Sequence, residues 1–229
     1  QMCIRDRLIS FFVLVISLNI FSQNGRNGPS LWEEIRDNSK LNYDNTKPQI
    51  TEALKKYNSH QYLINRLSKN GQRYLFYTVS EALKRDLPVE LSLIPFIESQ
   101  FDPYAQSSTG ASGIWQFIPS TAKENGLKKN WWYDARRDIV ASTNAAYNFL
   151  TKLHQEHDDW LIAIAAYNAG PSRVRKEIKK NKAKGLPTDF WSLNLPKETK
   201  AYVPKILALS EVIRNPQLSN IELPYLANM

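Results

Sequence analysis

Apolar side chains recur at helical spacing through most of this chain. Between positions 72 and 85 they occupy Leu75, Phe76, Val79, Ala82 and Leu83. This spacing places them on one face of a helix. Similar apolar faces are found over 61–69, 138–157, 159–170 and 196–214. No segment alternates apolar and polar residues between turn pairs, so the pattern predicts a mostly α protein without a sheet.

Proline, glycine and aspartate mark the predicted helix ends. Pro48 is placed to begin a helix that runs to about Asn58, since a first-turn proline loses no needed N–H. Asp138 is placed to cap the helix that ends near His157. Pro95 and Pro204 lie inside predicted helices, and we expect each to produce a kink.

The stretch Pro88–Thr121 carries the clearest candidate chemistry. It opens with a predicted helix that has Glu90 in its first turn, where an acid suits the helix dipole. Glu98 stands at the other end of that helix, directly after a strongly apolar run. Desolvation raises the pKa of a carboxyl group, and a carboxyl that is neutral near pH 7 can act as a proton donor. The alternative is a helix-end glutamate that simply reaches water.

Composition and charge narrow the class of protein. The 229 residues are 42% hydrophobic and 23% charged, as in an ordinary folded protein of one large or two small domains. The net charge of +8 favours an anionic partner, although much of the excess lies in 173–184, which is typical of a solvated helix face. No segment interleaves aromatic and basic residues, so we predict no nucleic-acid partner.

Cysteine and histidine are too few to suggest a metal site. The single cysteine, Cys3, lies in the leader QMCIRDR, which resembles an assembly scar and is excluded from fold reasoning. The three histidines have no metal-binding spacing. We therefore predict no disulfide, no structural zinc and no cofactor.

An apolar run, Leu8–Phe21, follows two arginines near the start of the chain. It has the length of a signal-peptide core and is shorter than the roughly 20 residues of a membrane-spanning helix. The alternative is a buried N-terminal helix. We predict an exported protein, located in the periplasm or cell envelope, which meets a membrane only if this segment stays uncleaved.

Four motifs occur in order along the chain: IESQFDPYAQSSTGASGIWQFIPSTA, YDARRD, LIAIAAYNAG and FWSLNLPKETKAYVPKILAL. Together they resemble the lytic transglycosylases of bacterial cell walls, and most of all the membrane-bound lytic murein transglycosylase D group. The resemblance implies a goose-type lysozyme-like helical domain preceded by N-terminal scaffold helices. We assign 1–23 to the leader and signal peptide and 24–47 to an N-terminal segment. The catalytic domain is 48–215 with its core at 86–215, and 216–229 is a C-terminal tail. We expect either that the protein is truncated there or that it binds the wall by its groove alone.

The resemblance implies a lyase that cleaves the β-1,4 bond between N-acetylmuramic acid and N-acetylglucosamine in peptidoglycan. The muramic acid's own 6-hydroxyl closes onto C1 and leaves a 1,6-anhydro sugar. A glycosidase normally needs a second carboxylate, whereas here Glu98 would act alone as acid and base. Two alternatives remain: a non-catalytic peptidoglycan-binding module, and a lysozyme-like hydrolase. We expect a monomer with peptidoglycan strands as its partner.

The resemblance also implies a set of substrate-binding residues. Ser107 and Gln116 align with positions that line the sugar cleft, where a hydroxyl or amide can bind acetamido groups. Gly110 provides either an unusual backbone angle or close approach to substrate, as does Gly113. Tyr167 would point its hydroxyl toward the carboxyl of Glu98. Each has a structural alternative: Ser107 as an exposed loop serine, Gln116 as a capping glutamine and Tyr167 as a buried core tyrosine.

Two further residues are evenly balanced between a cleft role and a structural one. Asn168 is either a cleft amide or a helix-end amide near Gly170. Glu198 is either a second acid that shapes the cleft or an acid in a helix's first turn. Asp102 is predicted to brace a loop rather than to act as a second catalytic acid. The candidates for stacking on sugar rings are Trp115, Trp131, Trp132 and Trp191, of which only one or two are expected to line the groove.

Overall fold

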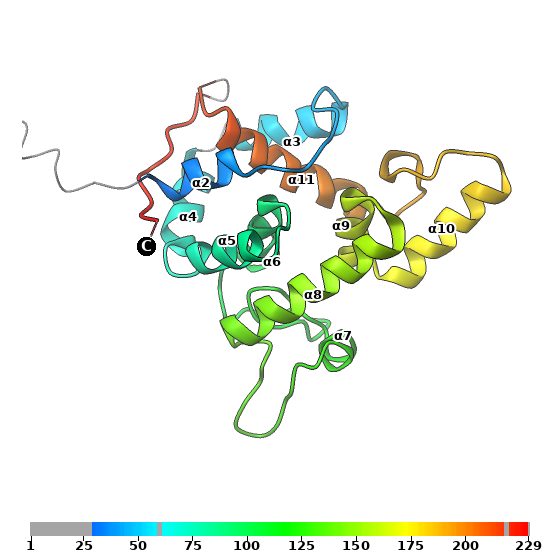
Figure 1. The fold of residues 1–229 in the computed structure, drawn as a ribbon, viewed down its shortest axis with the longest axis horizontal. Helices are drawn as coiled ribbons and strands as arrows, with labels where there is room; N and C mark the ends of the chain where they lie inside the picture. Colours follow the sequence, from blue (N-terminus) through cyan, green and yellow to red (C-terminus); the bar gives the residue numbers. More distant parts are fainter. Residues whose placement is uncertain (1–28, 59–60, 218–219, 229) are drawn as a thin grey trace, which may run out of the picture.

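The structure is a computed structural model that describes residues 29–58, 61–217 and 220–228. Within these ranges the chain is built from helices (Figure 1), with isolated β-bridges and no strand. The α-helices are α2 (Leu31–Asp37), α3 (Pro48–Asn58), α4 (Gln61–Gly71), α5 (Leu75–Lys84), α6 (Ile94–Ser99), α7 (Pro119–Glu124), α8 (Ile139–His157), α9 (Trp160–Ala169), α10 (Pro171–Ala183) and α11 (Lys197–Arg214). Two 3-10 helices are η1 (Val89–Leu93) and η2 (Phe190–Ser192). The prediction of a mostly α protein is confirmed.

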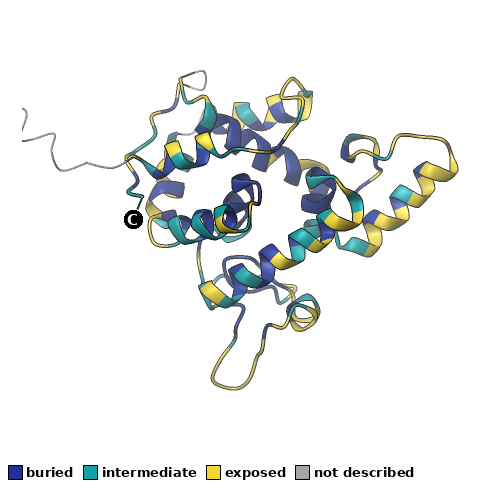
Figure 2. Cartoon of the chain, viewed as in Figure 1, coloured by how far each residue is buried: buried dark blue, intermediate teal, exposed yellow. Residues whose placement is uncertain are grey.

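Helix α11 organises the core. It packs against α3, α9, η1, α2 and α6, and most of its side chains from Tyr202 onward are buried. Helix α9 is apolar on nearly all sides, and it packs against α8, α10 and α11, which bury its side chains from Leu161 to Ala166. Figure 2 shows the buried faces of these helices turned inward, while α10 is largely exposed.

Several predicted helix ends are confirmed. Pro48 begins α3, and the Asp138 carboxylate accepts a hydrogen bond from the Ala141 N–H at the start of α8. Asp159 caps α9 in the same way, through the N–H groups of Leu161 and Ile162.

The helix predicted over 88–98 is two elements instead of one. Residues 89–93 form η1, and α6 begins at Ile94 with Pro95 in its first turn. A proline in that position needs no hydrogen-bond partner for its nitrogen, so it starts the second helix and does not kink a long one. Glu98 is therefore held at the end of a short helix that begins at Ile94.

Segments near both ends of the described chain pack together. The Leu31 N–H donates to the Leu226 carbonyl at 2.8 Å, and Trp32 Nε1 donates to the Pro224 carbonyl at 2.7 Å. Leu31, Trp32 and Leu226 are all buried. Described residues from 24–47 and from 216–229 thus contribute to the same core as the helices between them.

None of the helices in the described ranges is long and apolar enough to cross a membrane. The predicted signal segment, Leu8–Phe21, lies outside those ranges.

Candidate active site

Glu98 is the next-to-last residue of α6, and the chain turns sharply after it. Gln100 and Phe101 both adopt left-handed backbone angles, with φ of 56° and 61°. Two consecutive non-glycine residues in this region carry strain, of order 1 kcal/mol each. The turn is held by Asn70 of α4, whose side-chain amide donates to the Gln100 carbonyl at 3.0 Å, and by the buried Phe101 ring. The strain thus lies next to the candidate acid.

The carboxyl of Glu98 has an unusual pKa. Glu98 keeps partial solvent access, yet its surroundings are mostly protein, and this burial raises its pKa to about 7. A hydrogen bond from Tyr202 opposes the rise, the nearby charge of Glu198 adds to it, and that of Lys205 opposes it. All three residues lie on α11. Near neutral pH both protonation states of Glu98 are populated.

Tyr202, and not Tyr167, orients this carboxyl. The hydroxyl of Tyr202 donates to Glu98 Oε1 at 2.5 Å. The hydroxyl of Tyr167 instead donates to the Trp115 carbonyl at 2.6 Å. The predicted hydrogen bond from Tyr167 to Glu98 is therefore wrong. Tyr167 is nevertheless near enough for the charge of Glu98 to add to the rise in its own pKa, which is caused mainly by burial.

Two more predicted residues lie where α9 meets α11. The side-chain oxygen of Asn168 accepts a hydrogen bond from the Thr199 hydroxyl at 2.8 Å. Glu198 is exposed in the first turn of α11, and its charge acts on Glu98. Glu198 is thus an acid in the first turn of α11 whose charge acts on the candidate acid, and its cleft-shaping role stays a prediction.

The loop 105–117 contains Ser107, Gly110 and Gln116, and it contacts the helices around Glu98. Ser99, the neighbour of Glu98, donates its hydroxyl to the Ile114 carbonyl at 3.0 Å. The Ser107 hydroxyl oxygen accepts from the Ala111 N–H at 3.0 Å and is half-buried. The Gln116 amide nitrogen donates to the carbonyls of Ala105 and Gly113, at 3.2 and 2.8 Å. Within the described structure, Ser107, Gly110 and Gln116 make no hydrogen bond to Glu98.

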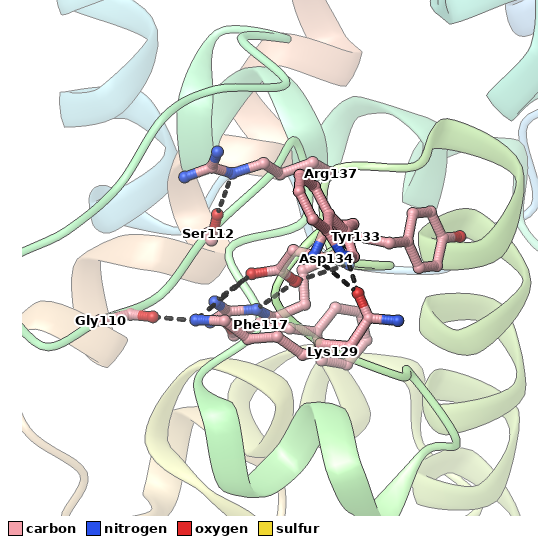
Figure 3. A network of polar contacts seen from close by, with 10 residues as sticks. Gly110, Ser112, Phe117, Lys129, Tyr133, Asp134 and Arg137 are labelled. Carbon is pink, nitrogen blue, oxygen red and sulfur yellow. Dashed lines mark hydrogen bonds and ion pairs between the residues drawn. The ribbon is translucent and has the colours of Figure 1, made fainter.

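A buried arginine, Arg136, binds two backbone carbonyls of this loop. Arg136 is 3% exposed and donates to the Gly110 carbonyl at 2.7 Å and the Phe117 carbonyl at 3.1 Å. The Asp134 carboxylate pairs with the same guanidinium at 2.6 Å. Figure 3 shows this network, in which Arg137 also reaches the Ser112 hydroxyl. The motif YDARRD is visible in the sequence, but its spacing alone indicates no role for this arginine.

The four tryptophans predicted as candidates for sugar stacking differ in their surroundings. Trp115 is fully buried and donates its indole N–H to the Thr143 hydroxyl at 3.0 Å, so it is a core residue and no stacking platform. Trp191 is half-buried against Phe190. Trp131 and Trp132 are 88% and 91% exposed in the loop between α7 and α8, which projects from the lower edge of the molecule in Figure 1.

Other acids near the site have structural roles. Glu90 lies in the first turn of η1, as predicted. It is also fully buried and accepts hydrogen bonds from the backbone N–H groups of Lys40 and Leu41 at 3.2 and 3.0 Å. The Asp102 carboxylate accepts from the Tyr104 N–H at 2.8 Å, as predicted for a loop brace. Among the described residues no group of three or more His, Cys, Asp or Glu is placed to hold a metal ion.

Residues 78–189 match the transglycosylase SLT domain family. This range includes Glu98, Tyr167 and the loop with its arginine. The matched range covers 112 of the 229 residues, just under half of the chain. Tyr202 and Glu198, which act on Glu98, lie in α11 beyond the matched range.

Named lytic transglycosylases resemble this chain over different lengths. Membrane-bound lytic murein transglycosylase D of Escherichia coli (strain K12) is 46% identical over 195 residues, which is 85% of this chain and 43% of that protein. Membrane-bound lytic murein transglycosylase F of Desulfosudis oleivorans is 32% identical over 108 residues, 44% of this chain and 22% of that protein. Lytic transglycosylase Slt of Pseudomonas aeruginosa, a solved structure, is 28% identical with a TM-score of 0.47, over 66% of this chain and 26% of that one. The chain thus spans under half the length of each of these relatives.

Proposed function

We propose that this protein is a lytic transglycosylase that cleaves peptidoglycan between N-acetylmuramic acid and N-acetylglucosamine. The observation that carries the proposal is a carboxyl group with a pKa of about 7, oriented by Tyr202, within an SLT domain. The name of its 46%-identical relative, a lytic murein transglycosylase, agrees with this activity.

Glu98 would serve first as a general acid and then as a general base. Its protonated carboxyl donates to the glycosidic oxygen while the bond from C1 of the muramic acid breaks. The carboxylate then accepts the proton of the muramic acid's 6-hydroxyl, whose oxygen bonds to C1. The product is a 1,6-anhydro sugar, no water is consumed, and Glu98 returns to its protonated form. A pKa near the working pH suits both steps.

The other residues would bind and position the strand. The loop that carries Ser107, Gly110 and Gln116 is fixed by Arg136, so its polar groups are organised before the sugar arrives. Asn168 of α9 and Glu198 of α11 would border the cleft together with this loop. We infer that the protein acts as a monomer in the cell envelope, after export directed by Leu8–Phe21.

Mass spectrometry of digested sacculi tests the reaction. We expect fragments that end in 1,6-anhydro-muramic acid, which are lighter by one water than the reducing ends left by a hydrolase. Reducing ends would contradict the lyase mechanism and support a hydrolase, with the exposed Glu198 as the acid to test next. Binding to sacculi without release of fragments would instead support a non-catalytic module.

Replacing Tyr202 by phenylalanine is expected to change the pH dependence of activity. The hydroxyl stabilises the carboxylate and lowers the pKa of Glu98, so its loss raises that pKa. Because the protonated form starts the reaction, kcat/KM falls as pH rises through this pKa. The alkaline limb of the variant should therefore move to higher pH. Its kcat should fall by about 10-fold for a separate reason, because the carboxyl loses the hydrogen bond that orients it.

Tyr167→Phe is the matched control for that measurement. It removes a tyrosine hydroxyl of the same neighbourhood, but one that bonds the Trp115 carbonyl and not Glu98. Its alkaline limb should stay in place. Equal shifts in both variants would contradict the role assigned to Tyr202.

A further inference from the structure

A cavity of about 480 Å³ lies between α3, α4, α6 and α11. It adjoins the helix of Glu98, since Phe96 and Ile97 of α6 form part of its wall. Most of its lining is apolar, from Tyr57 of α3, Leu63 of α4 and Pro204 of α11 in addition to α6. Of these four helices only α6 falls within residues 78–189, so the cavity is largely built from segments outside the matched SLT domain.

The cavity carries a strong excess of positive charge. Four lysines line it, Lys56 from α3 and Lys197, Lys200 and Lys205 from α11, against the single acid Glu52. Lys56 pairs with Glu52 at 3.4 Å. Lys200 donates to the Asn194 side chain at 3.3 Å, and no carboxylate of the described residues lies within ion-pair distance of Lys197, Lys200 or Lys205. Three exposed lysines of α11 thus line this largely apolar cavity without paired anions in the described part of the chain.

This combination is poorly suited to a bare sugar strand. Sugar hydroxyls need polar partners, and an apolar wall would leave many of them without hydrogen bonds. A short peptide with carboxylates and small alkyl side chains is complementary on both counts, because its methyl groups suit the wall and its charges suit the lysines.

Peptidoglycan contains such a ligand. Its muramic acid residues carry short peptide stems that are rich in alanine and bear free carboxylates, and these stems are attached to the sugar whose C1 would react at Glu98. A stem on a strand bound at Glu98 would therefore be delivered to the same region, where α6 and α11 border both the carboxyl and the cavity.

We propose that this cavity is a subsite for the acidic peptide stem of peptidoglycan and makes peptide-bearing strands the preferred substrate. The proposal rests on the function proposed above and goes further, since it assigns a substrate preference to lysines outside the reacting centre. Lys205 also affects the charge state of Glu98, so Lys197 and Lys200 are the residues to change.

The test compares two substrates and two double variants. The substrates are uncross-linked glycan strands with their peptides, and the same strands after the peptides are removed with an amidase. Lys197→Gln/Lys200→Gln removes two charges from the cavity, and Lys176→Gln/Lys179→Gln removes two from exposed positions of α10. Binding of the free stem peptide is measured separately by calorimetry.

The wild type should cleave peptide-bearing strands with a kcat/KM about 5-fold above that for bare strands, mainly through a lower KM. The cavity variant should lose this preference and bind free peptide more weakly, with its activity on bare strands unchanged. The α10 variant should behave as wild type on every measurement.

Equal wild-type rates on the two substrates would overturn the proposal, as would a preference or peptide affinity that both double variants retain. A cavity variant that loses activity on both substrates alike would also overturn it. If the wild type cleaves neither strand, the proposed function fails; peptide binding that depends on Lys197 and Lys200 would still support the subsite, and binding that does not depend on them would overturn it.

Discussion

Glu98→Gln should abolish turnover while peptidoglycan binding remains. The amide is close to the carboxyl in size and keeps a hydrogen-bond partner for Tyr202, but it has no acidic proton to give to the glycosidic oxygen. Loss of a general acid and base lowers kcat by roughly 100- to 10,000-fold, and we expect the upper end because the same group is needed twice. Release of soluble fragments from sacculi measures the rate, and a pull-down with intact sacculi measures binding.

The control is Glu124→Gln, a change of the same kind at an exposed position of α7. It should release fragments at the wild-type rate. A Glu98→Gln protein with normal turnover would show that another group is the acid, and would remove the main support for the proposed mechanism.

Glu98→Gln should also stabilise the folded protein at neutral and alkaline pH. Burial raises the pKa of Glu98 from the usual value of 4.5 to about 7 in the folded protein. Below pH 4.5 the carboxyl is protonated in both folded and unfolded chains, and its contribution to stability is fully present. As pH rises from 4.5 to 7 the unfolded chain ionises first, so this contribution is lost. Glutamine does not titrate. The free energy of unfolding of the Glu98→Gln protein should therefore exceed that of the wild type by roughly 1–3 kcal/mol at pH 8 and by little at pH 4.

Urea unfolding at pH 4 and pH 8 measures this difference. A stability gain that is equal at both values would mean that Glu98 is not desolvated as described. The unfolding data measure how much the burial of the Glu98 carboxylate destabilises the fold. The kinetics measure how much the same carboxyl group contributes to catalysis.

The helices were predictable because their signals are local. The long periodic segments α8, α9 and α11 follow from apolar spacing and from prolines or aspartates at their ends. The break between η1 and α6 was missed because Pro95 fits either a kink within one helix or the first turn of a new one. Sequence position alone does not separate these two roles.

The environment of Glu98 was predictable only in part. An acid after an apolar run suggested desolvation, and burial does raise its pKa. The partner was misassigned because Tyr167 and Tyr202 both lie near Glu98, and which hydroxyl reaches the carboxyl depends on how α9 and α11 are rotated. The buried positions of Glu90 and Trp115 are likewise set by contacts between distant segments, which local pattern does not encode.

Gly113→Ala should produce the largest loss of stability among the substitutions considered. Gly113 has a φ of +82°, and a Cβ atom there would lie 1.7 Å from the Arg136 carbonyl oxygen. This neighbour is backbone, and the Arg136 side chain is fixed by Asp134 and by the carbonyls of Gly110 and Phe117, so it cannot move aside without breaking the network. We expect a loss of more than about 3 kcal/mol, or no folded protein.

Gly126→Ala is the matched control for Gly113→Ala, because it separates the steric clash from the backbone angle. Gly126 has nearly the same φ, +77°, but no atom lies within 4 Å of the position that a Cβ would occupy there. Only the cost of a left-handed alanine applies at this site, about 1 kcal/mol. Urea unfolding of both variants gives the comparison, and equal losses would contradict the close approach of Arg136. A large excess loss at Gly113 would instead show that the loop with Ser107 and Gln116 keeps its shape because a glycine lets the backbone of Arg136 lie directly against it.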